Sequence, residues 1–520
     1  MRVVSVEQMR ELERLTFAAG VSEEELQRRA GTAVAETVLR LRPAGTSVVA
    51  LVGPGNNGRD AWIAADQLRA AGWRATLYLT ARHAITGTEL TAFARDGGRV
   101  VRQFEDEGAS LSLLLARSDV AIDGLVGIGG TGPLRPPLTE VADAVNAMHE
   151  SHPEMLTVAV DTPSGVNADT GDAVGVAVQA DATVVLGGAK RGLLTTRATA
   201  FTGRLIFADI GVLDACPEAP ELVTRASTRG MLPAPAADSH KGAFGRLLVV
   251  AGSERYVGAV YLVCAAAVRT GAGIVTLAAP RWLRNVIATR LPEITYLPLP
   301  DAGPAGAPEE SAEAILGDLA SFNALAVGPG LSVDGGAADF VEALLRGRAK
   351  SGLPTVLDAD GLNALARQGE WSAWLGENVV MTPHLGELRR LAPDVDPQAP
   401  PWDIVGRLTA SWPATLVLKG PFTAIGHDGR TWVHALPNPG LATGGTGDVL
   451  TGIIGGLLAR GLSPERAAQL GVWVHGRAGA LATSGRSAGG TMASDLIDSI
   501  PTALAETPED GPRVDLAALI

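Results

Sequence analysis

The sequence predicts an α/β protein in which two domains follow one another, each built on a parallel sheet covered by helices on both faces. Short apolar runs rich in valine alternate with amphipathic helical segments along most of the chain. The length of 520 residues exceeds what a single core usually organises. A proline-containing stretch, residues 216–237, interrupts the alternation and is expected to be a linker.

The first domain is expected to span residues 1–215. Its amphipathic patterns predict helices over Val6–Ala19, Glu23–Leu41 and Asp60–Ala71. Its apolar runs predict strands over Ser47–Val52, Ala75–Leu79, Val120–Ile122, Leu156–Val160, Ala182–Leu186 and Leu205–Ala208. Strands that alternate with helices in this way form a parallel sheet.

The second domain is expected to span residues 238–510. Strands are predicted at Arg246–Val250, Ile274–Ala278, Ala324–Val327, Thr355–Leu357, Val379–Met381 and Thr415–Leu418. Helices are predicted at Gly258–Thr270, Ala337–Leu345, Asp448–Arg460 and Pro464–Ala482. Phe422–Gly426 and Thr431–Ala435, separated by four turn-forming residues, predict a hairpin at a sheet edge.

Composition narrows the classes of function. A 46% hydrophobic and 19% charged chain is typical of globular proteins. The net charge of −13 argues against a nucleic-acid partner, although backbone N–H groups still allow an anionic small ligand. Two cysteines make no disulfide framework, and neither a signal peptide nor a membrane span is evident. We therefore expect a cytoplasmic protein, with no membrane partner, that forms a homo-oligomer.

The most specific motif is a glycine loop that opens a long apolar helix in the second half. Gly444, Gly445 and Gly447 surround Thr446, and Asp448 follows in the first helical turn. Such a loop points free backbone N–H groups at one place, at the positive end of the helix dipole, where a phosphate fits. A carboxylate beside that phosphate can act as general base on a hydroxyl. Alternatively, the glycines serve tight packing and Asp448 only caps the helix.

Polar residues and glycines also follow several predicted strands of the second half. They are Gly328–Gly330, Asp358 with Asp360, Thr382–Glu387 including His384, and Lys419-Gly420. Ligands of α/β proteins usually bind where parallel strands end, and a lysine there can reach a nucleotide phosphate. Taken singly, His384 is more often structural and the aspartates could be helix caps. Their recurrence at strand ends favours a binding site.

Residues 238–500 closely resemble the ADP-dependent NAD(P)H-hydrate dehydratases of the ribokinase-like superfamily. The matching segments include His240–Gly242, Ala251–Ser253, Gly258-Ala259, Arg269–Gly273, Pro292-Glu293, Gly328–Gly330, Asp358–Asp360, Thr382–His384, Gly386-Glu387, Leu418–Gly420, Gly444–Asp448, His475-Gly476 and Ala493–Asp495. The resemblance implies that ADP phosphorylates the hydroxyl of a hydrated nicotinamide ring. Phosphate then leaves, the ring double bond is restored, and AMP is the other product.

The resemblance also implies roles for individual residues. Asp448 would be catalytic. The substrate contacts would be Ala259, Gly330, His384 and Asp448, and the nucleotide contacts Lys419, Gly420, Pro421, Phe422, Thr423, Gly444, Gly445, Thr446 and Gly447. Mg²⁺ is expected with ADP, without protein ligands that we can name.

The first half carries its own anion-binding turn. Gly53 and Gly55–Gly58 connect a predicted strand to a helix, without the spacing of the dinucleotide fingerprint. The asparagines of this turn could offer amide oxygens to a cation. Asp123 and the segment Asp161–Gly165 end two further strands at the expected ligand edge. Alternatively, these residues are ordinary turns and caps.

Residues 1–211 resemble the NAD(P)H-hydrate epimerases, through Arg29–Gly31, Gly55–Gly58 with Asp60, Asp123–Gly132, Val158–Gly165, Ala180–Thr183, Lys190 and Gly192-Leu193. A Rossmann-like three-layer αβα domain before the ribokinase-like one is thereby implied. The family interconverts the R and S hydrates, so that a dehydratase acting on the S form can consume both. The implied potassium ligands are Asn57, Asp123 and Ser164. The implied substrate contacts are Asn56, Asn57, Gly58, Arg59, Asp60, Gly127, Ile128, Gly129, Gly130, Thr131, Gly132, Pro133 and Asp161, with Asp161 also a catalytic acid/base candidate.

One position departs from the family pattern. The loop usually reads Asn-Asn-Gly-Gly-Asp-Gly, whereas here Arg59 replaces a glycine and Ala61 follows Asp60. Arg59 either crowds the turn, if backbone freedom is required there, or binds a substrate phosphate. We expect the first half to retain epimerase activity because the proposed cation ligands and Asp161 are intact.

The main hypothesis is therefore a fused epimerase and dehydratase whose ligands are hydrated NADH or NADPH, ADP, Mg²⁺ and K⁺. The alternative is a ribokinase-like kinase of a vitamin alcohol with a non-catalytic N-terminal binding module. A kinase would release a stable phosphorylated product, whereas the dehydratase releases NADH and inorganic phosphate.

Overall fold

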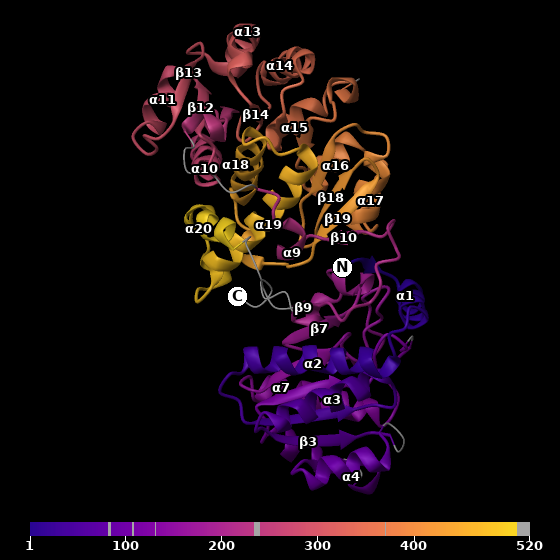
Figure 1. The fold of residues 1–520 in the computed structure, drawn as a ribbon. Helices are drawn as coiled ribbons and strands as arrows, with labels where there is room; N and C mark the ends of the chain where they lie inside the picture. Colours follow the sequence, from indigo (N-terminus) through magenta and orange to yellow (C-terminus); the bar gives the residue numbers. More distant parts are fainter. Residues whose placement is uncertain (82–84, 107–108, 131, 233–239, 370, 507–520) are drawn as a thin grey trace. The chain divides into compact units, whose positions relative to one another are not determined.

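The computed structural model describes residues 1–81, 85–106, 109–130, 132–232, 240–369 and 371–506. The chain divides into two compact units, one from Met1 to Leu222 and one that begins at Val223. Each unit has its own sheet with helices on both sides (Figure 1).

The sheet of the first unit has seven strands in the order β4-β3-β2-β5-β6-β7-β9, with every neighbouring pair parallel. Its strands are β2 (Ser47–Val52), β3 (Arg74–Leu79), β4 (Arg99–Arg102), β5 (Val120–Gly124), β6 (Leu156–Val160), β7 (Ala182–Leu186) and β9 (Arg204–Ala208). The chain runs from β2 toward one end of the sheet and then, from β5, toward the other, so the strand order reverses between β2 and β5. In such sheets ligands bind at the carboxyl ends of the strands beside the reversal, which here are β2, β5 and β6.

Two apolar clusters cover the two faces of this sheet. Val48, Ala50 and Val52 of β2 pack with α2 (Glu23–Leu41) and α3 (Asn56–Ala70). Val49 and Leu51 point the other way and pack with α6 (Leu111–Leu115) and α7 (Leu138–Ser151). This alternation is the period of two that buries a strand on both faces.

Smaller elements complete the first unit. They are β1 (Val3–Val4), α1 (Val6–Ala18), α4 (Gly87–Arg95), α5 (Gln103–Asp106), β8 (Ala189–Lys190), η1 (Arg191–Leu194), α8 (Thr199–Thr202) and β10 (Glu221–Leu222). Strand β1 pairs with β8 in a separate parallel pair. Helix α1 begins at a capping box formed by Ser5 and Gln8, and it packs Met9 and Leu12 into a third apolar cluster.

The sheet of the second unit runs in the order β19-β18-β17-β16-β15-β14-β11-β12-β13. Within this sheet, all neighbouring strands from β11 to β17 pair in parallel. These strands are β11 (Arg246–Val250), β12 (Ile274–Ala279), β13 (Thr295–Pro298), β14 (Ala324–Val327), β15 (Thr355–Leu357), β16 (Val379–Met381) and β17 (Thr415–Leu418). The hairpin of β18 (Thr423–His427) and β19 (Arg430–His434) continues the sheet antiparallel to β17. The carboxyl ends of the parallel strands therefore meet at one edge.

Two groups of helices accompany this sheet (Figure 1). Helices α10 (Val257–Arg269), α18 (Thr446–Ala459), α19 (Pro464–Thr483) and α20 (Ala493–Ala505) pack against one another in succession. The remaining helices are α9 (Arg225–Thr228), α11 (Arg281–Ile287), α12 (Gly303–Gly306), α13 (Pro308–Asp318), α14 (Ala337–Ser351), α15 (Ala359–Leu365), α16 (Leu385–Leu391) and α17 (Pro401–Thr409), with short 3₁₀ turns at Lys241–Phe244, Leu319–Ser321, Trp371–Trp374, Pro439–Leu441 and Ala488–Gly490.

Most predicted elements are present with bounds within one or two residues, but several are wrong. Helix α3 begins at Asn56 rather than Asp60, because Gly55 has extended backbone and ends the turn earlier than expected. Helix α18 begins at Thr446, and α14 continues to Ser351. Strands β4 and β13 were not predicted; they are short edge strands whose residues are half-buried or exposed, so they lack the apolar run that marks a central strand.

The predicted linker, 216–237, contains ordered elements. Strand β10 and helix α9 lie inside it, and the boundary between the two units falls between Leu222 and Val223. Residues 233–237 of this segment lie outside the described residues. No helix in the described part of the chain is both long and apolar enough to cross a membrane.

Candidate functional site

The glycine loop of the second unit leads directly into α18. Gly445 caps the helix in the left-handed region, with a φ of 93°, and a Cβ there would come within 2.5 Å of a Leu262 methyl carbon. Only glycine accepts both the conformation and the contact without strain. The glycine loop thus leads into the N-terminus of α18, and the free N–H groups of a helix N-terminus are suited to bind a phosphate.

Lys419 lies beside this loop at the end of β17. A Cβ on Gly447 would be 3.3 Å from Lys419 Nζ, which places the ammonium next to the first turn of α18. The ammonium donates to Asp358 Oδ1 at 2.7 Å and lies 3.9 Å from Glu387 Oε2. Asp358 is 1% exposed, and its other oxygen accepts the Thr451 hydroxyl at 2.6 Å. Lys419 is thus held by two carboxylates, Asp358 at the end of β15 and Glu387 of α16, and Thr451 of α18 in turn holds Asp358.

Asp448 has the properties of a general base at neutral pH. Burial raises its pKa to about 7, and the negative charge of Asp358 adds to this effect while Lys419 opposes it. A base whose pKa lies near the working pH combines a useful unprotonated fraction with a strong pull on the proton. The position of Asp448 in the first turn of α18 puts this carboxylate beside the glycine loop.

His384 is the N-cap of α16. Its Nδ1 accepts the Gly386 N–H at 2.9 Å, and Glu387 Oε2 accepts the His384 N–H in return. Because Nδ1 is an acceptor, the proton of a neutral imidazole is on Nε2, which lies 3.4 Å from Glu387 Oε1. The ring is 55% exposed and remains available to a ligand while its backbone is fixed.

The other predicted contacts of this half lie around the same edge. Gly330 has a φ of 63°, and a Cβ there would approach Tyr256 and Ala259 at the start of α10. Gly420 follows Lys419, and Thr423 donates its hydroxyl to the Gly420 carbonyl at 3.0 Å. Pro421 is exposed, whereas the Phe422 ring is buried.

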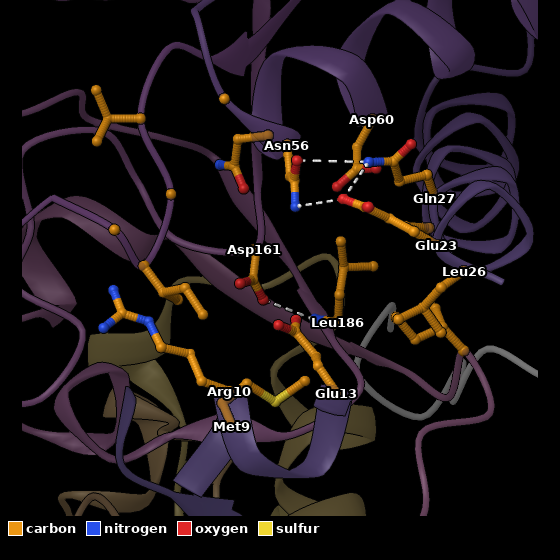
Figure 2. Close-up of a pocket in the computed structure, with 18 of the residues that line it drawn as sticks. Met9, Arg10, Glu13, Glu23, Leu26, Gln27, Asn56, Asp60, Asp161 and Leu186 are labelled. Atoms are coloured by element: carbon orange, nitrogen blue, oxygen red, sulfur yellow. Dashed lines mark hydrogen bonds between the residues drawn. The ribbon is translucent and has the colours of Figure 1, made fainter. Parts of the chain in front are cut away.

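The first unit contains a cavity of about 430 Å³ at the carboxyl ends of β2, β5 and β6. Its lining includes Asn56, Asn57, Asp60, Gly127, Ile128, Gly129 and Asp161 from the predicted set. Helices α1 and α2 and strand β8 contribute further polar groups, namely Arg10, Glu13, Glu23, Gln27 and Lys190. Figure 2 shows Glu13, Glu23, Gln27, Asn56, Asp60 and Asp161 around the cavity, on side chains that come from several of its walls.

Asp161 lies at the centre of this site with a φ of 60°, a conformation that non-glycine residues adopt rarely. Its Oδ1 accepts the Leu186 N–H at 3.0 Å and forms an ion pair with Lys190. Lys190 is 1% exposed and also donates to the Leu186 carbonyl at 2.7 Å. An uncommon backbone conformation that is held by a buried ion pair indicates a functional position.

Two further carboxyl groups face the same cavity. Burial raises the pKa of Asp60 well above its ordinary value, and the charges of Asp161 and Glu13 add to this. Burial also raises the pKa of Glu13, against the opposing influence of Lys190. Asp60 Oδ1 is buried and has no hydrogen-bond partner among the described residues. The cavity therefore has a carboxylate in a buried ion pair, Asp161, and two carboxyl groups with a raised pKa, Asp60 and Glu13.

The proposed potassium ligands gather behind the cavity. Ser164 donates both its N–H, at 2.8 Å, and its hydroxyl, at 2.6 Å, to the fully buried carboxylate of Asp123. Asn57 donates to the Val160 carbonyl, and its amide oxygen faces Gly127. Burial raises the pKa of Asp123, so a cation beside it would stabilise the charged form. This donor set of oxygens fits a hard monovalent cation.

Arg59 turns away from the cavity. Its guanidinium forms an ion pair with Glu89 of α4 at 2.8 Å and stacks over the Trp62 ring, 5.2 Å from the ring centroid. Gly58 packs closely against the backbone of the turn: a Cβ at this position would lie 2.2 Å from the Gly53 carbonyl oxygen. Neither residue lines the cavity, and nor do Gly130, Gly132 and Pro133. Thr131 lies outside the described residues.

Comparison with known proteins matches both halves. The family model described as YjeF-related protein N-terminus matches residues 23–192, and the model described as NAD(P)H-hydrate dehydratase matches residues 247–502. A bifunctional NAD(P)H-hydrate repair enzyme of Moorella thermoacetica is 36% identical over 538 residues, covering 100% of this chain and 99% of that protein. One of Thermofilum pendens is 35% identical, covering 98% and 97%.

The chain belongs to the family of bifunctional NAD(P)H-hydrate repair enzymes. Among solved structures, an ADP/ATP-dependent NAD(P)H-hydrate dehydratase of Bacillus subtilis is 30% identical and covers 56% of this chain and 99% of its own, with a TM-score of 0.48. The predicted fold class is confirmed, since two α/β units with parallel sheets match the two family models in the predicted order.

In this repair enzyme, sequence reasoning missed the residues that hold the predicted ones. Asp358 and Glu387 were noted only as strand-end polar residues, yet they orient Lys419. Lys190 was noted only as part of the resemblance, yet it pairs with Asp161. Glu13 was missed, although a signal existed: it lies at i+4 from Met9 and i−3 from Thr16, on the packed face of α1.

Proposed function

We propose that the second unit dehydrates the S hydrate of NADH or NADPH with ADP as phosphoryl donor, and that the first unit interconverts the R and S hydrates. The observation that carries the dehydratase half is the position of Asp448. It combines a pKa of about 7 with a place in the first turn of α18, beside Lys419 and the glycine loop.

The geometry supports a direct sequence of steps. Asp448 takes the proton of the ring hydroxyl, whose oxygen attacks the terminal phosphorus of ADP, and AMP leaves. The N–H groups from Gly444 to Gly447 and the Lys419 ammonium stabilise the negative charge of the phosphoryl group in transfer. The phosphate then leaves the ring carbon while a proton leaves the neighbouring carbon, which restores the double bond. Ala259, Gly330 and His384 would contact the substrate, and Gly420 to Thr423 the nucleotide.

Mg²⁺ would accompany the nucleotide. The described residues contain no cluster of three or more His, Cys, Asp or Glu side chains arranged for a metal ion. Mg²⁺ commonly binds through substrate phosphates, waters and only one or two carboxylates. A site without a carboxylate cluster therefore fits a Mg²⁺ ion that binds together with the nucleotide. When bound, the ion would neutralise phosphate charge.

In the first unit, Asp161 would be the acid/base group of epimerisation, and the cavity residues Asn56, Asn57, Asp60 and Gly127 to Gly129 would surround the substrate. Asn57, Asp123 and Ser164 would hold K⁺, whose charge compensates the buried Asp123 carboxylate. We further propose that residues 1–215 carry the epimerase and 238–510 the dehydratase. Two buried free cysteines, Cys216 and Cys264, agree with a cytoplasmic location, and a homo-oligomer stays a prediction.

The test is incubation of purified protein with mixed hydrate epimers, ADP, Mg²⁺ and K⁺. We expect complete recovery of NADH absorbance in a single phase, with one phosphate released per NADH. A stable phosphorylated product would instead indicate a vitamin-alcohol kinase with a binding module. A fast phase that consumes one epimer, followed by a slow phase at the uncatalysed rate, would refute the epimerase half. Turnover without nucleotide would refute the phosphoryl-transfer mechanism.

A further inference from the structure

Helix α1 forms a wall of the first-unit cavity and lies outside the matched family model, which begins at residue 23. The helix buries Met9, Leu12 and Thr16. Glu13 shares the face of these residues, and it lines the cavity together with Met9 and Arg10. A glutamate on the packed face of an amphipathic helix needs a reason beyond solubility, because burying a carboxylate is costly.

Glu13 and Asp161 approach the cavity from opposite walls. Figure 2 shows Glu13 extending from α1 toward Asp161, which comes from the end of β6. Charged groups act on Glu13 from every neighbouring element: Arg10 of α1, Glu23 of α2, Asp60 of α3, Asp161 after β6 and Lys190 of β8. Lys190 is committed to Asp161 by a buried ion pair, and burial raises the pKa of Glu13 on the facing wall.

A second observation points to a polar ligand between these walls. Asp60 is 7% exposed, lines the same cavity, and leaves Oδ1 without a hydrogen-bond partner. Buried polar atoms are nearly always satisfied, so an orphaned oxygen at a cavity marks a place where a ligand or ordered water binds. The cavity of about 430 Å³ is large enough for a hydroxylated ring.

The chemistry of the substrate requires two proton transfers. Water adds to the enamine double bond of a dihydronicotinamide at the carbon next to the ring nitrogen, so the hydroxyl-bearing carbon is a hemiaminal centre. Inverting that centre means breaking one C–O bond and forming another on the opposite face. An acid must protonate the departing hydroxyl, and a base must deprotonate the incoming water.

We propose that Glu13 is a catalytic residue of the epimerase site and acts with Asp161 as a two-sided acid/base pair; the inference rests on the proposed epimerase function. The Glu13 carboxyl gives its proton to the hydroxyl, the C–O bonding pair leaves as water, and the nitrogen lone pair forms a C=N⁺ bond. Water then adds from the other face, and Asp161 takes the proton. This turnover leaves Glu13 ionised and Asp161 protonated, and proton exchange with solvent water resets the pair. Epimerisation in the opposite direction uses the two groups in exchanged roles, and neither direction needs an oxidant or a reductant.

The experiment uses the full-length protein and one purified epimer of hydrated NADH, without nucleotide, so that the dehydratase does not act. Epimer exchange is followed over a pH series for wild type, Glu13→Gln, Glu13→Asp and the control Glu11→Gln. Glu11 is an exposed residue of the same helix, paired only with Arg14. An infrared titration of the same proteins records the protonated carboxyl of Glu13 independently of activity.

We expect Glu13→Gln to slow exchange ~10²–10⁴-fold and to remove the fall in rate at alkaline pH. Glu13→Asp should keep that fall, and Glu11→Gln should behave as wild type. A protonated-carboxyl band that persists above the pH at which a free glutamate ionises should vanish in Glu13→Gln. The proposal is overturned if Glu13→Gln keeps near-wild-type exchange, or loses rate with an unchanged pH profile. If Glu13→Gln does not fold, wild type is compared with Glu13→Asp instead. The proposal is then overturned if wild type has no protonated-carboxyl band whose frequency shifts in Glu13→Asp. A wild type that binds hydrate without exchange refutes the epimerase function as well.

Discussion

The two candidate sites have the same ground plan but distribute charge differently. Each lies where parallel strands end, and each has a lysine paired with a buried aspartate: Lys419 with Asp358 and Lys190 with Asp161. In the second unit Asp448 is not part of the ion pair and lies beside the glycine loop. In the first unit the predicted acid/base residue, Asp161, is itself in the pair, and Asp60 and Glu13, both with a raised pKa, lie outside it.

This difference separates the chemistry that each site favours. Transfer of a phosphoryl group to a hydroxyl needs one base next to an anion site, and a single carboxylate with a pKa of about 7 supplies it. Inversion at a hemiaminal carbon needs an acid and a base together. A paired carboxylate and two carboxyl groups held toward protonation supply both.

The largest expected effect comes from Asp448→Asn. The substitution keeps the size of the side chain and removes the base, so we expect ADP-dependent dehydration to fall ~10²–10⁴-fold while ADP still binds. The matched control is Asp339→Asn, because Asp339 is exposed and occupies the same third position of its helix, α14. Single-turnover kinetics and ADP titration measure the two quantities.

Stability gives Asp448→Asn a second readout. The folded state holds the Asp448 proton to about pH 7, whereas the unfolded chain loses it near the ordinary value of 3.8. This group's contribution to stability therefore falls as pH rises between those values. The thermal midpoint of Asp448→Asn at pH 8 should equal or exceed that of wild type. Retained dehydration, or a large drop in the midpoint, would contradict the role of Asp448.

A smaller effect is expected from pH and from Lys419. Wild-type dehydration should rise about tenfold per pH unit below pH 7 and level off above it, because only the unprotonated Asp448 acts as base. Lys419→Gln removes the cation that lowers the pKa of Asp448, so the midpoint of this profile should move to higher pH and KM for ADP should rise. An unmoved midpoint would show that Lys419 and Asp448 do not interact in the working enzyme.

The smallest effect is expected from Arg59→Gly. Because Arg59 pairs with Glu89 and stacks on Trp62 outside the cavity, epimer exchange by the variant should stay within about twofold of wild type. Loss of a surface ion pair, ~0.2–1 kcal/mol, and a glycine inside α3, about 1 kcal/mol, should lower the thermal midpoint by a few degrees. Arg59→Ala separates the two terms. Faster exchange by Arg59→Gly would mean that the arginine obstructs the loop.

The sequence by itself determined the succession of two α/β domains and the sheet edges where we propose that ligands bind. Valine-rich runs such as Ser47–Val52 are buried on both faces and leave few alternatives to a central parallel strand. The glycine that caps α18, Gly445, has a positive φ and carries this backbone requirement in the residue type itself. Such features are local, so spacing and composition predict them.

Only the tertiary structure decided which charges face one another. Lys419 and Asp358 are 61 residues apart, and Lys190 and Asp161 are 29 apart, so no local pattern announces either ion pair. Edge strands β4 and β13 were also not predicted, because their residues are exposed or half-buried and form no apolar run. The orientation of Arg59 depends on its ion pair with Glu89 of α4. The raised pKa of Glu13 depends on its burial and on Asp161, which follows β6 far along the chain. Electrostatic energies depend on distances and burial in three dimensions, and these arise only when the chain folds.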